Sequence, residues 1–292
     1  SPWVTAMPGL LSYGLKDPDG HPCDSYAACD KVFYQLLEAG GLDLRHAINS
    51  DAVLIDALLM ELHRRGVTVS EHSISLIGNW NSIYAKSLHL TFSEAACNNI
   101  YRWSGSDLGN SERCLNRQKG VHPLNKTAMS PEDFGITQYS YTSAEEEYDK
   151  QALISNIKRS KPRAIGILGT APKDTLLILQ GLKKEFPGVL FFTTNLDFQY
   201  LQNSEQKQSR NLIVASQFGL QLAPSLQQSI PPFRSSLQTS TFFAVLHAIG
   251  RVKFEPSGNT PKFIPTDHGS THRFAAYIPP RLFEIGRHGA VD

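Results

Sequence analysis

The sequence has no long apolar run. Its best candidate, "DAVLIDALLMEL" from residue 51, is interrupted by Asp56, whereas a helix that spans a bilayer needs about 20 predominantly apolar residues. We therefore predict no membrane span in these 292 residues. The same stretch is instead typical of a buried amphipathic helix.

An excess of charge of one sign is also lacking. The chain carries 28 Lys and Arg residues against 27 Asp and Glu residues, for a formal net charge of +1. Proteins that bind nucleic acid usually carry a clear basic surplus, so we expect no nucleic-acid partner. With 41% hydrophobic and 19% charged residues, the composition is that of a globular chain with a substantial core.

Cysteine is scarce, and the four cysteines in the chain are too few for a fold held together by disulfides. Cys23 and Cys29 flank a short polar stretch, and two interpretations stay open: a disulfide in an oxidising compartment, or two free thiols. No C-x-x-C pair is present to start a zinc site. His268 and His272 lie in a Gly-Ser segment without a helical pattern, so we expect no metal site there either.

Sequence signatures of common catalytic sites are missing as well. There is no G-x-S-x-G, no G-x-x-x-x-G-K-[ST] and no complete G-x-G-x-x-G, which argues against hydrolase, P-loop and dinucleotide-binding functions. Cys97 lies at the apolar end of a helical pattern and is typical of a core thiol. We therefore expect no enzyme and no cofactor. An α/β enzyme that uses Asp174, Asp197 or a histidine of the C-terminal tail is the least supported alternative.

What the sequence does have is a regular alternation of strand and helix patterns. This alternation predicts an α/β fold, with a mainly parallel, doubly wound, Rossmann-like sheet and helices on both of its faces. We predict strands at residues 3–7, 42–48, 73–80, 137–142, 163–168, 188–195 and 211–218, and helices at residues 26–39, 50–66, 82–97, 143–161, 172–186 and 232–250.

Several predicted helices begin with consistent signals. Ser50 is a suitable N-cap and is followed by Asp51 in the first turn. Ser143 and Glu146 have the spacing of a capping box. Pro172 falls in the first turn of the helix that follows "RAIGILGT", where proline is well tolerated.

The order of the predicted elements, together with the family resemblance described below, divides the chain into three expected regions. Residues 1–71 form an N-terminal α/β portion, and residues 72–254 form the main α/β lobe. Within that lobe, residues 102–135 are rich in Gly, Ser, Asn and Pro and are expected to form an insertion loop, since so long an irregular segment is usually functional or disordered. Residues 255–292 are expected to form an irregular tail with short strands such as "RFAAYI" and "RLFEIG".

Candidate ligand-binding residues follow from the expected sheet. In an open parallel sheet, ligands bind outside the carboxyl ends of the strands. The residues predicted there are polar or aromatic and mostly uncharged, which suits hydrogen bonding and stacking with a small polar molecule. They are Asn79, Trp80, Asn81, Tyr84, Gly169, Thr170, Asp174, Thr194, Asn195, Asp197 and Gln217.

Structural roles for some of these residues stay open as alternatives. Thr170 and Asn195 stand where side chains commonly cap helices. Trp80 and Tyr84 would serve equally well as aromatic residues of the core.

The segment "HSISLIGNWNSIYAKSLHLTFSEA", residues 72–95, contains a strand, a corner and a helix. It resembles the segment of type 1 periplasmic binding proteins in which an Asp-x-x-Tyr-Gly corner separates a strand from a helix. Tyr84 matches that corner, while Asn81 and Ala85 depart from it. The strands and helices from "KPRAIGILGT" to "STFFAVLHAIG" follow in the order of this family, so the resemblance covers about residues 72–250.

The resemblance implies a non-enzymatic binding or sensor domain, periplasmic or extracellular, for a small polar ligand such as an amino acid. Residues 1–71 would then supply part of a first lobe. Membrane-tethered relatives convert lobe closure into a signal, which implies a larger membrane-associated protein with protein partners. The alternative is a ligand-free structural or protein-interaction domain of the same fold, whose apolar surface patch is buried only in an assembly.

Overall fold

The computed structural model describes residues 39–41, 51–68, 73–79, 82, 84–85, 88–89, 91–93, 95–96, 136–140, 150–202, 206–249 and 279–292. The strands are β1 (Ile74–Gly78), β2 (Ile136–Ser140), β3 (Ala164–Leu168), β4 (Leu190–Thr194), β5 (Leu212–Ser216), β6 (Arg281–Gly286) and β7 (Gly289–Val291). The helices are α3 (Asp51–Arg64), α6 (Lys150–Ser160), α7 (Pro172–Leu182), the 3-10 helix η3 (Phe198–Leu201), α8 (Gln206–Ser209), α9 (Pro224–Gln227) and α10 (Ser236–Ala248).

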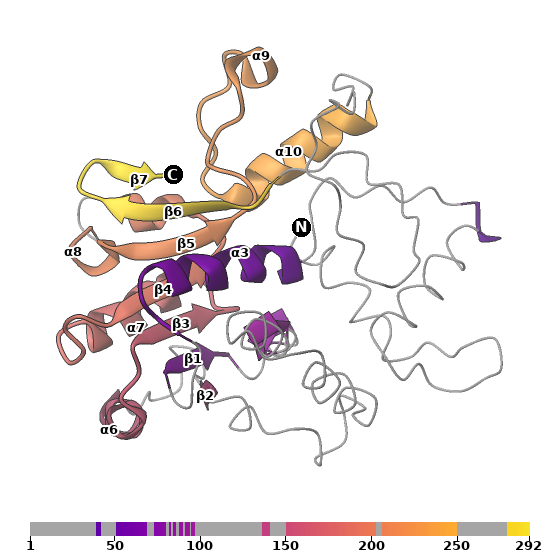
Figure 1. The fold of residues 1–292 in the computed structure, drawn as a ribbon. Coiled ribbons are helices and arrows are strands. Elements are labelled where there is room, and N and C mark those ends of the chain that lie inside the picture. Colours follow the sequence, from indigo (N-terminus) through magenta and orange to yellow (C-terminus); the bar gives the residue numbers. More distant parts are fainter. Residues whose placement is uncertain are drawn as a thin grey trace.

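In the described part of the chain the strands form one seven-stranded sheet, in the order β2-β1-β3-β4-β5-β6-β7 (Figure 1). The first five of these strands are parallel; Ile74 of β1, for example, lies opposite Ile136 on one side and Ala164 on the other. Only β6 and β7 run antiparallel to their neighbours. The predicted mainly parallel α/β sheet is confirmed.

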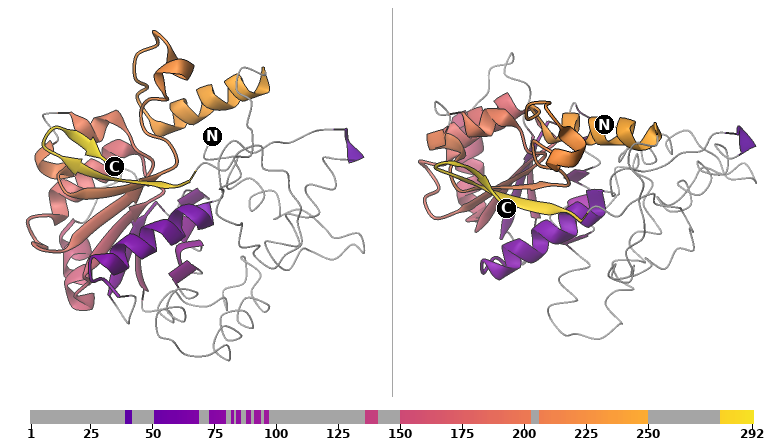
Figure 2. Two further views of the ribbon diagram at one scale, coloured as in Figure 1. Left: turned by 45° about the horizontal axis from the view of Figure 1, so that its top comes forward. Right: turned by 90° about the horizontal axis from the view of Figure 1, so that it is seen from above.

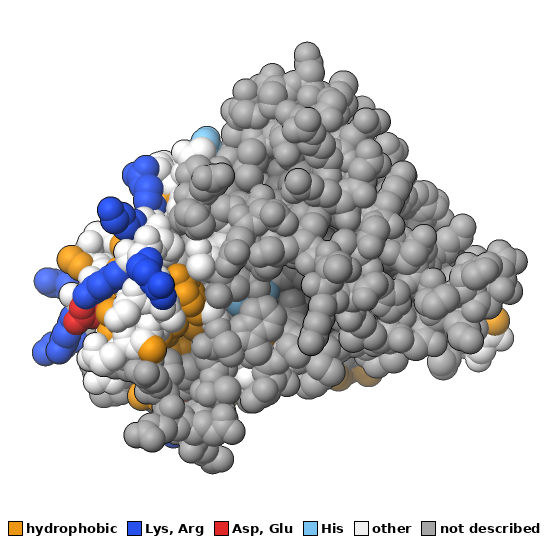
Figure 3. Space-filling model, turned by 90° about the horizontal axis from the view of Figure 1, so that it is seen from below, with side chains coloured by type: hydrophobic (Ala, Val, Ile, Leu, Met, Phe, Trp, Pro, Cys, Tyr) orange, Lys and Arg blue, Asp and Glu red, His pale blue; other side chains and the backbone are white. Residues whose placement is uncertain are grey.

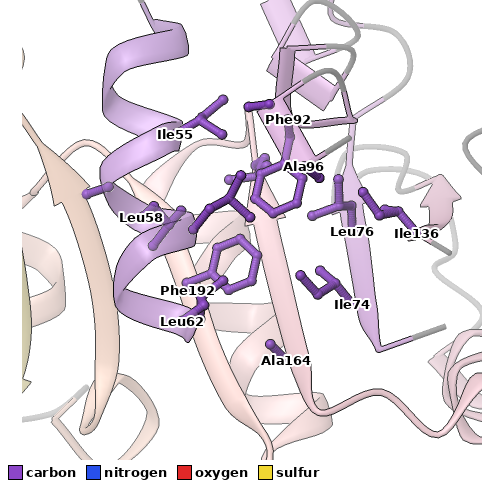
Figure 4. Close-up of a cluster of buried hydrophobic side chains, with 14 of the residues drawn as sticks. Ile55, Leu58, Leu62, Ile74, Leu76, Phe92, Ala96, Ile136, Ala164 and Phe192 are labelled. Carbon is purple, nitrogen blue, oxygen red and sulfur yellow. The ribbon is translucent and has the colours of Figure 1, made fainter. Parts of the chain in front are cut away.

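Two hydrophobic clusters cover the two faces of the sheet. On one face, α3 and the helical residues between 84 and 96 pack on β1, β3, β4 and β5 (Figure 4). Phe92 and Phe192 stack at the centre of this cluster, with ring centroids 5.6 Å apart. On the other face, α6, α7 and η3 pack against the opposite side chains of the same strands. The sheet is therefore covered on both faces, as expected for a doubly wound fold.

Helix α3 is the buried amphipathic helix that its sequence predicts. Five apolar residues at helical spacing are buried, Asp51 lies in the first turn, and His63 and Arg64 lie in the last. No helix among the described residues is long and apolar enough to cross a membrane. The buried residues are Leu54, Ile55, Leu58, Leu59 and Leu62.

The structure differs from the sequence interpretation at both ends of the main lobe. Helix α3, which was assigned to the N-terminal portion, packs on the same sheet as the lobe and contributes to the same cluster. The stretch "RLFEIG" is a strand, as predicted, but it pairs with β5 and continues into β7, so residues 281–291 belong to the sheet and not to an irregular tail. Phe283 and Ile285 are buried because β6 turns alternate side chains toward the second cluster.

Helix boundaries differ by a few residues from the predicted ones. Helix α10 begins at Ser236 with Ser235 as its N-cap, because Ser235 accepts a hydrogen bond from the N–H of Gln238. Several predictions lie outside the described residues: the strands at 3–7 and 42–48, nearly all of the helix at 26–39, the capping box of Ser143, the insertion loop, "RFAAYI", all four cysteines, and His268 and His272.

Candidate functional site

The candidate site lies at the edge of the sheet where β1, β3, β4 and β5 end, which we call the carboxyl edge. Because these strands are parallel and in register, the residues that follow them meet at this one edge. The structure places Asn79 after β1, Gly169 and Thr170 after β3, Asn195 after β4 and Gln217 after β5. Their part in ligand binding stays a prediction.

The strand order reverses between β1 and β3, and the chain leaves these two strands toward opposite faces of the sheet. Such a reversal normally opens a crevice for a ligand. Here Gly169 lies directly against Ala85: a Cβ atom on Gly169 would lie 2.4 Å from the Cα of Ala85. Gly169 therefore serves close packing of the backbone at this point.

Behind Gly169, buried hydroxyl groups form a connected network. The hydroxyls of Thr170 and Thr175 lie 2.7 Å apart, and Tyr200 is hydrogen-bonded with Thr175 and Thr193. Thr193 in turn donates to the carbonyl oxygen of Ile167 at 2.6 Å. Burial raises the pKa of Tyr200 above its ordinary value, so its phenol stays protonated and able to donate.

This network decides the role of Thr170. The N-cap of α7 is Ala171, which makes no side-chain cap, and the hydroxyl of Thr170 is bonded to Thr175 instead. The alternative that Thr170 caps the helix is wrong, because the hydroxyl turns toward the buried network. Sequence reasoning missed Thr175 and Tyr200 as members of this network, and no local pattern connects them.

The corner after β4 joins the corner after β1. The side chain of Asn195 is hydrogen-bonded to the hydroxyl of Tyr84, which packs against the first cluster. Burial raises the pKa of Tyr84, the negative charge of Asp51 raises it further, and the bond to Asn195 acts in the opposite direction. Asp51, in the first turn of α3, therefore lies near this pair, a neighbour that sequence reasoning did not foresee.

Asn195 itself is exposed, and its backbone is left-handed, with φ of 66°. Its N–H donates to the carbonyl oxygen of Ala215 at 2.9 Å, which ties the corner to β5. Asparagine is one of the few residues that adopt this conformation readily. Asn195 is thus an exposed residue at the carboxyl edge, and the N-cap of the following helix is Asp197, so the structural alternative that Asn195 caps a helix is wrong.

Asp197 is the N-cap of η3, where its carboxylate accepts from the N–H of Gln199 at 2.9 Å. Burial raises the pKa of Asp197, while the Gln199 N–H and the charge of Arg234 act against that rise. The same segment holds the start of α10, since Asp197 forms a β-bridge with Ser235. The carboxylate is half-buried and positioned at the carboxyl edge.

The remaining candidate ligand-binding residues differ in how far they are buried. Asp174 is half-buried in the first turn of α7, whereas Thr194 and Gln217 are buried, with exposed fractions of 6% and 9%. Trp80 and Asn81 lie outside the described residues. No cluster of His, Cys, Asp or Glu suited to a metal ion occurs in the part of the chain that the structure describes.

A hollow of about 720 Å³ lies away from the carboxyl edge, between α3 and the β6–β7 hairpin. Its charges are matched within the chain: Arg65 pairs with Glu61 at 2.8 Å and with Glu284 at 3.0 Å, and Arg281 pairs with Asp292. These ion pairs connect α3 and the C-terminus to the sheet, which is a structural role.

Comparison with known proteins gives matches in structure only. No protein-family model and no curated protein matches the chain. A fatty acid ABC transporter substrate-binding protein from Thermomonospora curvata is similar, with 9% identity and a TM-score of 0.50 over 90% of this chain and 71% of that protein. The C-domain of LpoA from Haemophilus influenzae, described as a regulator of PBP1A, has 8% identity and a TM-score of 0.44 over 90% of this chain and 78% of that domain.

The chain spans 34% of full-length LpoA from Haemophilus influenzae, at 8% identity and a TM-score of 0.38 over 76% of this chain. The likeness to the Thermomonospora curvata protein concerns the fold alone. It agrees with the strand order and with the helices that cover both faces of the sheet. The described residues have a mainly parallel α/β fold like that of type 1 periplasmic binding proteins.

Proposed function

We propose that this chain is a non-enzymatic, extracytoplasmic binding domain of a larger membrane-associated protein, and that its carboxyl edge takes a small polar ligand such as an amino acid. The observation that carries the proposal is the bond between Tyr84 and Asn195, which joins two strand corners at an exposed asparagine. The fold is also that of a protein described as substrate-binding in an ABC transporter.

The chemistry of the corner after β4 suits such a ligand. A carboxamide offers two donors and two acceptor positions, so the single bond to Tyr84 leaves Asn195 able to contact a second molecule. Asp197 adds a half-buried carboxylate beside it. Such a set favours a ligand with amino, hydroxyl or carboxylate groups, which can both donate and accept.

The test is a thermal-shift screen of the whole chain against amino acids, small peptides, sugars, purines and carboxylates. A ligand present at 100 times its Kd stabilises the folded state by about 2.7 kcal/mol, which is a shift of several degrees. We expect a hit whose shift is lost in Asn195→Ala. A panel without any hit, or a hit that Asn195→Ala leaves unchanged, contradicts the proposal.

Asn211→Ala is the matched control. Asn211 is also exposed and left-handed, with φ of 62°, but it lies at the opposite end of β5, where its N–H donates to the carbonyl oxygen of Ile285 at 2.8 Å. Both substitutions place alanine in the same unfavourable backbone conformation. A loss of the ligand shift in Asn195→Ala alone therefore reports binding and not general destabilisation.

One observation favours a second function, a protein-interaction domain of the same fold. Helix α10 presents large apolar side chains to solvent: the exposed fractions of Leu237, Val245 and Ile249 are 37%, 51% and 63%. Exposed apolar surfaces of this kind usually mark an interface.

A further inference from the structure

Helix α10 lacks the polar outer side of an ordinary surface helix. Four residues on the side that faces the rest of the lobe are buried, and three of them are hydroxyl residues: Ser236, Thr239 and Ser240, together with Phe243. The exposed side instead carries leucine, valine and isoleucine. A helix on the surface of a monomer normally has the opposite arrangement. The outward side of α10 is therefore built as a contact surface.

The exposed residues form one ridge. Leu237, Thr241, Val245 and Ile249 follow one another at intervals of four residues, which places them in a row along the helix. All four are exposed. In Figures 1 and 2, α10 extends away from the sheet beyond the carboxyl edge, so this ridge projects from the lobe.

The surroundings of the ridge carry almost no charge. From Gly219 to Ile249 the sequence contains no Asp, Glu or Lys, and Arg234 is its only arginine. By contrast, α6 ends with Lys158 and Arg159, and Figure 3 shows Lys and Arg side chains gathered on the described part of the lower face. Depletion of charge together with apolar exposure is typical of the centre of a protein interface.

We propose that the ridge of α10 is a self-association surface, on which two copies of this chain pair α10 with α10 about a two-fold axis. A two-fold interface requires a surface that is complementary to itself. A neutral apolar ridge meets this requirement, since its copy brings no like charge against it. A strongly charged partner, in contrast, would find no opposite charge along the ridge.

The spacing of the ridge also specifies how the helices cross. Ridges of residues four apart interdigitate at a crossing angle of about −50°, the commonest class of helix packing. In the antiparallel arrangement with Thr241 at the crossing point, Leu237 of one copy lies near Val245 of the other, because the two residues are four positions from Thr241 on opposite sides. Thr241 is small enough for the two helices to approach closely.

The area available extends beyond α10. One side of a 13-residue helix about 20 Å long offers less area than the roughly 800 Å² per partner that a stable dimer buries. The α9 segment adds the exposed Ile230 and is attached to α10 through the contact of Phe233 with Phe242, whose ring centroids lie 5.2 Å apart. We therefore expect the two-fold contact to include Ile230, which follows α9.

Sedimentation velocity of the full chain without ligand, from about 1 to about 100 µM, tests this proposal. We expect a monomer–dimer equilibrium, weakened at least tenfold by Val245→Asp. The matched control is Leu177→Asp on α7, which changes a leucine of similar exposure, 43%, on a different surface. We expect this control to leave the dimer unchanged, and circular dichroism to show that both variants are folded.

A second variant tests the geometry. Leu237→Lys combined with Val245→Asp in the same chain places opposite charges across the two-fold axis, so the double variant should regain the dimer that Val245→Asp loses. A monomer at every concentration, equal weakening by Leu177→Asp, or failure of the double variant to regain the dimer would each overturn the proposal. Because no ligand is present in this experiment, its outcomes do not test the proposed ligand site.

Discussion

The corners after β3 and β4 have the same backbone and opposite uses. In each, the first residue after the strand is left-handed: Gly169 has φ of 69° and Asn195 has φ of 66°. Gly169 lies against Ala85 with no room for a side chain, whereas Asn195 is exposed. The residue at this position thus follows its surroundings, with glycine where a neighbour presses close and asparagine where the side chain is displayed.

The comparison also limits what a polar residue at a strand end implies. Thr170 and Asn195 are both polar and lie at the same edge. The hydroxyl of Thr170 belongs to a buried network, while the amide of Asn195 reaches one partner, Tyr84, and remains exposed. Ligand contact is therefore expected after β4 and not after β3.

The largest effect is expected for Gly169→Ala. The new Cβ would lie 2.4 Å from the Cα and 2.5 Å from the Cβ of Ala85, and the backbone would be strained as well. Overpacking costs about 1–3 kcal/mol and left-handed backbone about 1–2 kcal/mol, so we expect a loss of about 3 kcal/mol in the free energy of unfolding. Chemical denaturation measures it.

Gly188→Ala separates the two contributions. Gly188 is also left-handed, with φ of 82°, but nothing lies within 4 Å of its hypothetical Cβ. This variant should lose only the backbone part, about 1 kcal/mol. Equal losses for the two variants would mean that the contact with Ala85 is not what requires glycine after β3.

A smaller loss is expected for Tyr200→Phe, which removes the phenol from the network behind the β3 corner. Thr175 and Thr193 are nearly completely buried, and each would lose one partner while keeping another. We expect a loss of about 1–2 kcal/mol in the free energy of unfolding.

Tyr139→Phe is the control for this exchange, because the hydroxyl of Tyr139 donates to the carbonyl oxygen of Asn156 at 3.1 Å in a half-buried position on β2. Water can replace that bond more easily, so the loss should be smaller. If Tyr139→Phe costs as much as Tyr200→Phe, the buried network does not stabilise the fold more than the half-buried bonds of Tyr139 to Asn156 and Ser160 do.

Sequence reasoning correctly predicted the helices and strands whose signal lies in neighbouring residues. The apolar spacing of α3, the proline at the start of α7 and the apolar runs of β3 to β5 all led to elements that the structure contains. The four-residue helices η3, α8 and α9 escaped prediction, because one turn is too short to show a period.

What sequence reasoning missed are contacts between residues far apart in the chain. Nothing local in "RLFEIG" specifies pairing with β5, and nothing in "DFQYL" connects Tyr200 with Thr175. The nearness of Asp51 to Tyr84 depends likewise on how α3 packs on the sheet. The residues at the strand corners could therefore be predicted from the sequence. Which of these corner residues is exposed could not be predicted, because exposure depends on contacts between distant parts of the chain.

The smallest effect on the free energy of unfolding is expected for Asp197→Asn, which tests the role of the carboxylate at the β4 corner. Burial raises the pKa of Asp197, so its carboxyl group holds a proton at higher pH in the folded state than in the unfolded state, where the pKa is about 3.9. The contribution of this group is therefore most favourable below about pH 4 and is lost as the pH rises through its raised folded value.

Asparagine caps a helix as well as aspartate does and cannot ionise. We expect Asp197→Asn to gain up to about 0.5 kcal/mol at pH 7, and to flatten the fall in Tm between pH 4 and pH 7 relative to the parent. Asp197→Ala should instead lose about 1 kcal/mol at every pH, since the bond to the Gln199 N–H disappears. Parallel pH profiles for the parent and Asp197→Asn would show that the carboxylate is as well solvated in the folded chain as in the unfolded one, and would leave Asn195 as the β4-corner group that supports ligand binding.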